Sequence, residues 1–244
     1  MSGHSKWATT HRQKSAADAK KGAAFTKIAN LITMAAKQSG GDIDANFALR
    51  LAVDKAKTAN MPKDNIERAI KRGTGEGGEG KNFEEVTYEI FGPAGSVFIA
   101  EAITDNKNRT VSDLKAILNR NGGQLGALNS VSWMFERKGV IVLDAAALAG
   151  KNQDDLELAL IDAGADDIAR EADAWEIQTA PDKLNAVIIA LKNEGLEAKE
   201  SGLQYLSKND VAIGDQEDQR KVENFYNLLD DLDDVNAVYT NANW

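Results

Sequence analysis

The sequence predicts a multidomain α+β protein in which an N-terminal helical bundle is followed by two α/β domains. Three observations support this prediction. The 244 residues exceed an ordinary single domain. Apolar residues recur at helical spacing before residue 72, and strands alternate with helices beyond residue 81. One of the two α/β domains has the ferredoxin-like order βαββαβ and is expected to be inserted in the other.

Residues 1–72 are predicted to form the helical bundle. A first helix is capped by Ser15 and ends at Gly40, a second covers 45–59, and a third begins at Pro62. The apolar stripe of the first helix comprises Phe25, Ile28, Ile32 and Ala35. Basic side chains fall on the outer faces, so the bundle should present a cationic surface.

The stretch "GTGEGGEG" (73–80) follows the bundle and is predicted to be a flexible linker. It also matches the pattern G-x-G-x-x-G of dinucleotide-binding loops. That pattern requires a strand before it and a helix after it, whereas here a helix precedes and a strand follows. Glu76 and Glu79 would repel a pyrophosphate, so the linker interpretation is favoured.

The domain after the linker is predicted to be discontinuous, formed by 81–132 and 207–244. Its expected elements are strands at 84–91 and 96–104 around the turn Gly92–Gly95, a helix from Thr110 to Asn121 capped by Thr110, a helix carrying Val222, Phe225, Tyr226 and Leu229, and a strand at 235–240. The late helix and strand need partners, and pairing them with the earlier ββα segment is the economical solution. A C-terminal hairpin docked elsewhere is the alternative.

The inserted domain is predicted to cover 133–206. The stretch "SVSWMFERKGVIVL" is expected to supply strand residues at its start. Its strands are placed near 140–143, 167–171, 174–179 and 197–206, and its helices near 152–163 and 181–193.

The charge is divided along the chain. Residues 1–72 contain 14 Lys and Arg against 6 Asp and Glu, whereas the remainder contains 15 basic and 32 acidic residues. Such asymmetry is typical of a polyanion-binding segment joined to one that does not bind polyanions. A helical surface that is merely rich in lysine is the alternative.

The basic segment therefore supplies the candidate nucleic-acid-binding residues. They are His4, Lys6, Trp7, His11, Arg12, Lys14, Lys20, Lys21, Lys27, Arg68, Lys71 and Arg72. The cations would neutralise phosphates, and Trp7 would stack on a base or, alternatively, pack on the first helix. A docking surface for an acidic protein is the competing function class.

A secondary anion contact is a further candidate at Asn106, Lys107, Asn108 and Arg109, where a strand meets a helix N-terminus. A turn with a helix cap explains the same residues equally well. The acidic run Asp230, Asp231, Asp233 and Asp234 lacks the spacing of a calcium loop and is interpreted as a solvated helix end.

No catalytic, metal or cofactor site is predicted. The chain has no cysteine and only two histidines, both in the basic segment, so no Ser/His/Asp arrangement is available. His4 and His11 could in principle bind a metal, but no cysteine or close carboxylate cluster completes a shell. No apolar run is long enough for a membrane span, and no secretory core follows Met1. We expect a cytoplasmic protein that binds neither membranes nor a small-molecule substrate and is not an enzyme.

Four motifs in order resemble the YebC/PmpR family along essentially the whole chain. They are "GHSKWATTHRQKSAADAKKGAAFTK", "ANMPKDNIERAIKRGTG", "TDNKNRTVSDLKAILNRNGGQLG" and "SVSWMFERKGV". Two departures occur: the family often has Gly-Pro-Gly-Gly at Gly92–Gly95, where this chain has Ala94, and often has Pro in the segment that reads "ANFALR" here.

The resemblance implies a three-domain protein, helical first and then α/β, with the function of a DNA-binding transcriptional regulator. Some relatives, including the mitochondrial activator of cytochrome oxidase subunit I translation, are tied instead to the ribosome and to relief of stalling at proline runs. The partner is thus expected to be DNA or, as the alternative, ribosomal RNA.

Overall fold

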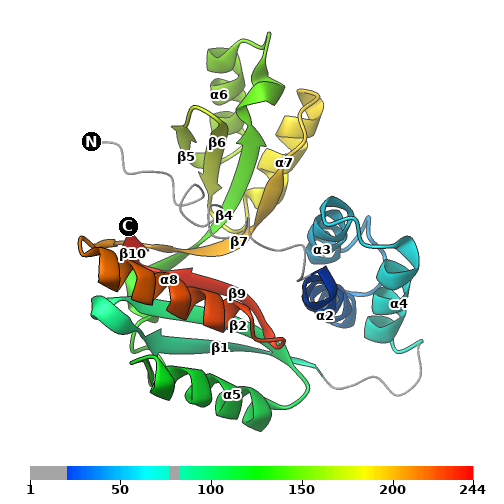
Figure 1. Cartoon of the computed structure of the whole chain (residues 1–244). Helices are drawn as coiled ribbons and strands as arrows, with labels where there is room; N and C mark the ends of the chain where they lie inside the picture. Colours follow the sequence, from blue (N-terminus) through cyan, green and yellow to red (C-terminus); the bar gives the residue numbers. More distant parts are fainter. Residues whose placement is uncertain (1–20, 77–82, 244) are drawn as a thin grey trace. The chain divides into compact units, whose positions relative to one another are not determined.

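The computed structural model of the chain describes residues 21–76 and 83–243. These residues form two compact units. Among the described residues, the first unit joins the segment from Lys21 to Phe135 with the segment from Ser207 onward, and the second is Glu136–Leu206. The architecture is mixed α+β, with helices first and strands and helices after them, which confirms the predicted fold class (Figure 1). The predicted domain boundaries, at 72, 80, 132 and 206, stay predictions.

Three helices open the first unit: α2 (Lys21–Ser39), α3 (Phe47–Thr58) and α4 (Lys63–Thr74). Their shared core contains Ile28, Ile32, Leu49, Val53, Ile66 and several alanines. Three members of the predicted apolar stripe, Ile28, Ile32 and Ala35, are buried as their helical spacing indicated, and Phe25 packs against the same core. The predicted start of the first helix near Ala16 lies outside the described residues.

Side-chain caps fix the corner between α2 and α3. The Asn46 side-chain oxygen accepts from the Leu49 N–H at 3.0 Å, which caps α3. Its amide nitrogen donates to the carbonyls of Ala35 and Gly40, both at 2.8 Å. Asn46 is 2% exposed, so its side chain satisfies backbone groups at the end of α2 and the start of α3 from within the bundle.

Helix α4 continues through Gly73 and Thr74, the first two residues of the predicted linker. A Cβ at Gly73 would lie 2.4 Å from the Thr33 carbonyl oxygen and 2.7 Å from the Ala36 Cβ. The glycine therefore allows α4 to approach α2 closely, and here it serves helix packing inside the bundle.

A four-stranded sheet follows in the same unit, with the order β3-β1-β2-β9. Its strands are β1 (Glu84–Phe91), β2 (Val97–Thr104), β3 (Gln124–Leu125) and β9 (Val235–Thr240). Each neighbouring pair is antiparallel. The chain thus returns after the second unit to place β9 beside β2, which is the pairing that the sequence favoured over a separately docked hairpin. The same unit also contains a separate two-stranded parallel sheet, formed by β8 (Val211–Ala212) and β10 (Ala242–Asn243).

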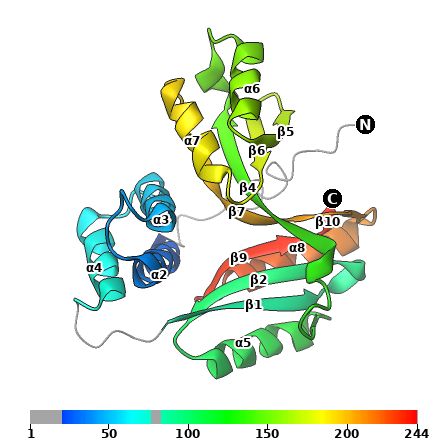
Figure 2. The same cartoon turned by 180° about the vertical axis from the view of Figure 1, so that it is seen from behind.

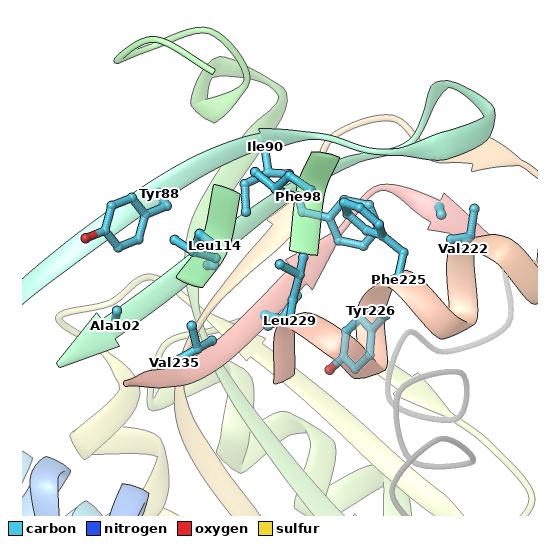
Figure 3. Close-up of a cluster of buried hydrophobic side chains, with 14 of the residues drawn as sticks. Tyr88, Ile90, Phe98, Ala102, Leu114, Val222, Phe225, Tyr226, Leu229 and Val235 are labelled. Carbon is cyan, nitrogen blue, oxygen red and sulfur yellow. The ribbon is translucent and has the colours of Figure 1, made fainter. Parts of the chain in front are cut away.

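Helices α5 (Lys107–Arg120) and α8 (Gln216–Asp230) cover one face of this sheet (Figures 1 and 2). Leu114 of α5 and Phe225 and Leu229 of α8 meet Ile90 and Phe98 of the sheet in one buried cluster (Figure 3). The rings of Phe98 and Phe225 lie 5.1 Å apart between centroids with a tilted geometry, which is a favourable arrangement for aromatic pairs.

The β1–β2 hairpin is closed by a short 3-10 turn, Pro93–Gly95. Ala94 in this turn has φ 53° and ψ 30°, the left-handed conformation that a Cβ disfavours. This is one of the two positions where the chain departs from the motif pattern, and glycine would adopt the observed backbone without strain.

Helix α5 begins three residues earlier than the sequence predicted. Its N-cap is Asn106, whose side-chain oxygen accepts from the Arg109 N–H at 3.1 Å, so the prediction of Thr110 as the cap was wrong. Thr110 is buried, and its hydroxyl lies 2.7 Å from a carboxylate oxygen of Asp234. The prediction failed because the local sequence around a threonine is the same whether its hydroxyl caps a helix or contacts a carboxylate remote in sequence.

The second unit contains a sheet of order β5-β6-β4-β7 with two helices, which is the ferredoxin-like arrangement (Figure 1). Its elements are β4 (Phe135–Asp144), α6 (Gln153–Asp162), β5 (Ala165–Arg170), β6 (Ala174–Thr179), α7 (Leu184–Asn193) and β7 (Glu200–Ser207). Strand β4 is antiparallel to β6, and β6 to β5. The Arg170 guanidinium lies 4.7 Å from the ring centroid of Trp175, a cation–π contact.

Candidate nucleic-acid interface

The outer face of α4 carries three exposed basic side chains, Arg68, Lys71 and Arg72, which are called the α4 basic face below. Ile66 and Ala69 on the same helix are buried in the bundle, so helical spacing turns the three cations outward. Lys71 and Arg72 lie in the last turn, where the negative end of the helix dipole favours positive charge.

Local hydrogen bonds orient Arg68. Its Nε donates to the Asp64 carbonyl at 3.2 Å, and a terminal nitrogen donates to the side-chain oxygen of Asn65. Neither Lys71 nor Arg72 has an ion pair within the described part of the chain. Two cations are thus available to an external anion, and the third is aligned along the same helix.

The α4 basic face sits on a rigid support. The Thr33 hydroxyl of α2 donates to the Ala69 carbonyl of α4 at 3.1 Å, and Gly73 packs closely against the same turn of α2. Sites built on packed helices are positioned more precisely than sites on loops. The spacing of the three cations is therefore set before any ligand arrives.

Most of the other predicted binding residues lie outside the described part of the chain. His4, Lys6, Trp7, His11, Arg12, Lys14 and Lys20 lie outside the described residues, and Lys21 is described only as the first residue of α2. Of the twelve candidates, the structure brings together Arg68, Lys71 and Arg72. The binding role of all twelve stays a prediction.

Lys27 lies in a different environment from the α4 basic face. It is half-buried, and its ammonium donates to the Asp230 carbonyl at the end of α8. The side chain of Asn236 donates to the Lys27 carbonyl at 2.9 Å. Both bonds join α2 to the C-terminal segment of the same unit, so Lys27 contributes to internal packing and is not counted in the α4 basic face.

The Asn106–Arg109 corner is rich in cations that already have carboxylate partners. Lys107 lies 2.6 Å from Glu84, and Arg109 lies 2.9 Å from Asp105 and 3.0 Å from Asp234. The hydrogen bond to Glu84 raises the pKa of Lys107, and that to Asp234, followed by Asp105, raises the pKa of Arg109. The observed bonds are those of a turn and a helix cap, and an anion contact there stays a prediction.

Asp234 ties the C-terminal segment to this corner. Its carboxylate lies within hydrogen-bond distance of the hydroxyls of Thr104 and Thr110, and its carbonyl accepts from the Ile103 N–H at 2.8 Å. The interpretation of the whole acidic run as a solvated helix end was therefore wrong for Asp234. Its partners precede it by more than 100 residues, beyond the reach of a local pattern.

The structure also places an exposed tryptophan that the sequence assigned to a strand. Ser132–Met134 form a 3-10 turn, and β4 begins only at Phe135. The Trp133 side chain is 66% exposed. The residue that holds this loop, Glu89, accepts from the Asn129 N–H from 40 positions earlier, so no local pattern indicated the exposed indole.

Within the described ranges, no group of three or more His, Cys, Asp or Glu side chains has an arrangement that could hold a metal ion. The same ranges contain no helix that is both long and apolar enough to cross a membrane.

Comparison with known proteins identifies relatives along the full chain. The family description "TACO1/YebC protein N-terminal domain" matches residues 5–76, and "TACO1/YebC second and third domain" matches 83–242. A protein of Fusobacterium nucleatum named "Probable transcriptional regulatory protein" is 46% identical over 241 residues, covering 99% of this chain and 95% of the relative.

A protein of Caldanaerobacter subterraneus with the same name is 46% identical over 242 residues, covering 99% of this chain and 98% of the relative. Among solved structures, a conserved hypothetical protein from Aquifex aeolicus superposes with a TM-score of 0.82 at 38% identity, covering 93% of this chain and 91% of that one. The chain belongs to the TACO1/YebC family.

Proposed function

We propose that this protein is a nucleic-acid-binding regulatory protein, and specifically a DNA-binding transcriptional regulator, whose α4 basic face contacts backbone phosphates. The observation that carries the proposal is the outward exposure of Arg68, Lys71 and Arg72 on one rigid helix. Three cations on one helix face can each neutralise a phosphate of a polyanion. The names of the relatives, probable transcriptional regulatory proteins, support the regulatory role.

The charge distribution supports the same assignment. The segment that contains α4 has 14 basic and 6 acidic residues, and the remainder has 15 basic and 32 acidic residues. An acidic body repels nucleic acid, so a ligand would approach through the basic segment. His4, Lys6, Trp7, His11, Arg12, Lys14, Lys20 and Lys21 are proposed to extend this contact.

Ribosomal RNA is the second candidate ligand, because cations on α4 can bind phosphates without reading a base sequence. Base edges in the major groove are read by paired hydrogen bonds, from Arg to guanine or from Asn or Gln to adenine. The outer face of α4 offers Asn65 for this purpose, and its side-chain oxygen already accepts from Arg68. A surface of this kind contacts phosphates more readily than it recognises a sequence.

Charge reversal tests the phosphate contact. The triple variant Arg68→Glu/Lys71→Glu/Arg72→Glu should bind all sequences more weakly and reduce the salt slope of log Kd by about 3, roughly one unit for each lost phosphate contact. The matched control is Lys115→Glu/Arg120→Glu/Lys192→Glu, which makes the same change of charge at exposed sites on α5 and α7. If both variants lose the same affinity, the loss is due to net charge alone, and a specific role of the α4 basic face is refuted.

Two further measurements separate the ligands. A DNA-reading regulator should prefer one promoter over bulk competitor DNA, because base contacts add specificity to the phosphate attraction. A ribosome-associated protein should instead sediment with ribosomes, lose that association after digestion of the RNA, and bind DNA without preference.

A further inference from the structure

The loop between β3 and β4 is held in place by one buried carboxylate. Glu89 is 6% exposed and lies on the sheet face opposite α5 and α8, because it alternates with Tyr88 and Ile90 of the helix-covered core. Its carboxylate accepts from the N–H groups of Asn129 and Val131, both at 2.6 Å, and of Ser132 at 2.8 Å. Three short charge-assisted bonds anchor the backbone of this loop to the sheet.

The ordered loop presents a tryptophan to solvent. Trp133 is 66% exposed, and its ring nitrogen donates to the Ser130 carbonyl at 3.1 Å. This bond satisfies the polar edge of the indole within the loop and restrains the ring. An exposed indole forgoes the hydrophobic free energy that its burial would release. Packing within the chain therefore does not explain why the loop bound by Glu89 turns Trp133 toward solvent.

A cation is bound to the backbone of the same tryptophan. The Lys208 N–H donates to the Met134 carbonyl at 2.8 Å, and its ammonium donates to the Trp133 carbonyl at 3.0 Å. Lys208 is exposed, and its ammonium has two further N–H donors beyond this bond. The exposed indole of Trp133 and the ammonium that binds its carbonyl thus belong to one surface of the first unit.

We propose that Trp133 and Lys208 form a second nucleic-acid contact that binds one unpaired nucleotide, with the base stacked on the indole and the phosphate bound by the ammonium. The inference rests on the proposed function and adds a site outside the basic N-terminal segment. The aromatic ring complements the π-face of any base, and the cation complements the neighbouring phosphate. A base within a duplex is already stacked on both faces, so the site selects single-stranded segments.

The experiment compares single-stranded and duplex oligonucleotides. Binding of the full chain to a labelled 16-nucleotide RNA, to the same sequence as DNA, and to their duplexes is followed by fluorescence anisotropy. Trp133→Ala should weaken binding to the single strands by about fivefold or more, as expected for loss of one stacked base, and leave duplex binding within about twofold. Trp133→Phe retains a ring and should keep most of the affinity.

Leu128→Ala is the matched control, because Leu128 is 85% exposed on the same loop and cannot stack on a base. Unchanged single-strand affinity in Trp133→Ala would overturn the proposal. An equal loss in Leu128→Ala would also overturn it, since the loop would then be an apolar docking surface for protein. If duplex binding persists and still depends on the α4 basic face, the proposed function survives that failure. If the unaltered chain binds no oligonucleotide, both proposals fail.

Discussion

Replacing Glu89 by Gln tests whether a buried charge orders the Trp133 loop. A carboxamide keeps one oxygen, which can still accept from Val131 and Ser132, and it turns an NH₂ group toward the Asn129 N–H. One buried donor then loses its partner, at a cost of about 1–3 kcal/mol, and the remaining two bonds lose their charge assistance. We expect Glu89→Gln to lower the free energy of unfolding by about 2–4 kcal/mol in urea denaturation followed by circular dichroism.

The pH dependence of the difference identifies the charge as the cause. Burial raises the pKa of Glu89, but the N–H donors of Val131, Ser132 and Asn129 outweigh burial and hold the pKa below its ordinary value of 4.5. The carboxylate therefore stabilises the fold above about pH 4.5, and this contribution is lost as the pH falls through the lowered pKa.

The stability advantage of the unaltered chain over Glu89→Gln should accordingly shrink under acid conditions. Glu223→Gln is the matched control, because Glu223 is an exposed glutamate on α8, and its unfolding free energy should change by less than about 0.5 kcal/mol. A constant difference between Glu89→Gln and the unaltered chain from pH 7 to pH 3 would refute a role for the ionised carboxylate.

Two further changes test backbone positions. Gly73→Ala should lower the free energy of unfolding by about 1–3 kcal/mol in urea denaturation, because its Cβ would lie 2.4 Å from the Thr33 carbonyl oxygen. Gly22→Ala is the control: nothing lies within 4 Å of its added Cβ, so it should be neutral or stabilising. Equal effects of the two substitutions would contradict the close packing of α4 against α2. Ala94→Gly should raise the free energy of unfolding by about 0.5–1 kcal/mol, measured by thermal denaturation, because glycine relieves the left-handed strain at φ 53°. The gain is small because glycine also loses more entropy on folding. A destabilised variant would show that Ala94 is not strained.

The elements of this fold were predictable where their signals are local. The helical stripe Ile28–Ile32, the two strands of the first hairpin and the βαββαβ order are set by side-chain periodicity and by turn residues, which act over a few positions. The basic spacing of Arg68, Lys71 and Arg72 was readable for the same reason. A helix with buried Ile66 must turn these side chains outward.

Other features depended on partners that are remote in sequence. Thr110 matches a capping pattern, yet its hydroxyl is engaged by Asp234, 124 positions later, because β9 lies beside β2. Lys27 has the spacing of an outward cation, yet its ammonium meets the Asp230 carbonyl, 203 positions later. No local pattern distinguishes a lysine that faces solvent from one that faces the end of another helix.

The sequence by itself determined the α+β class, the order of the elements, the division of charge and the outward face of α4, since each follows from periodicity or composition within a short segment. Only the tertiary structure decided that Glu89 orders a loop 40 residues away and that Trp133 is exposed beside Lys208. The reason is physical: burial and the pairing of a charge depend on which segments the sheet order brings together, and a side chain's own neighbours in sequence carry no record of that order.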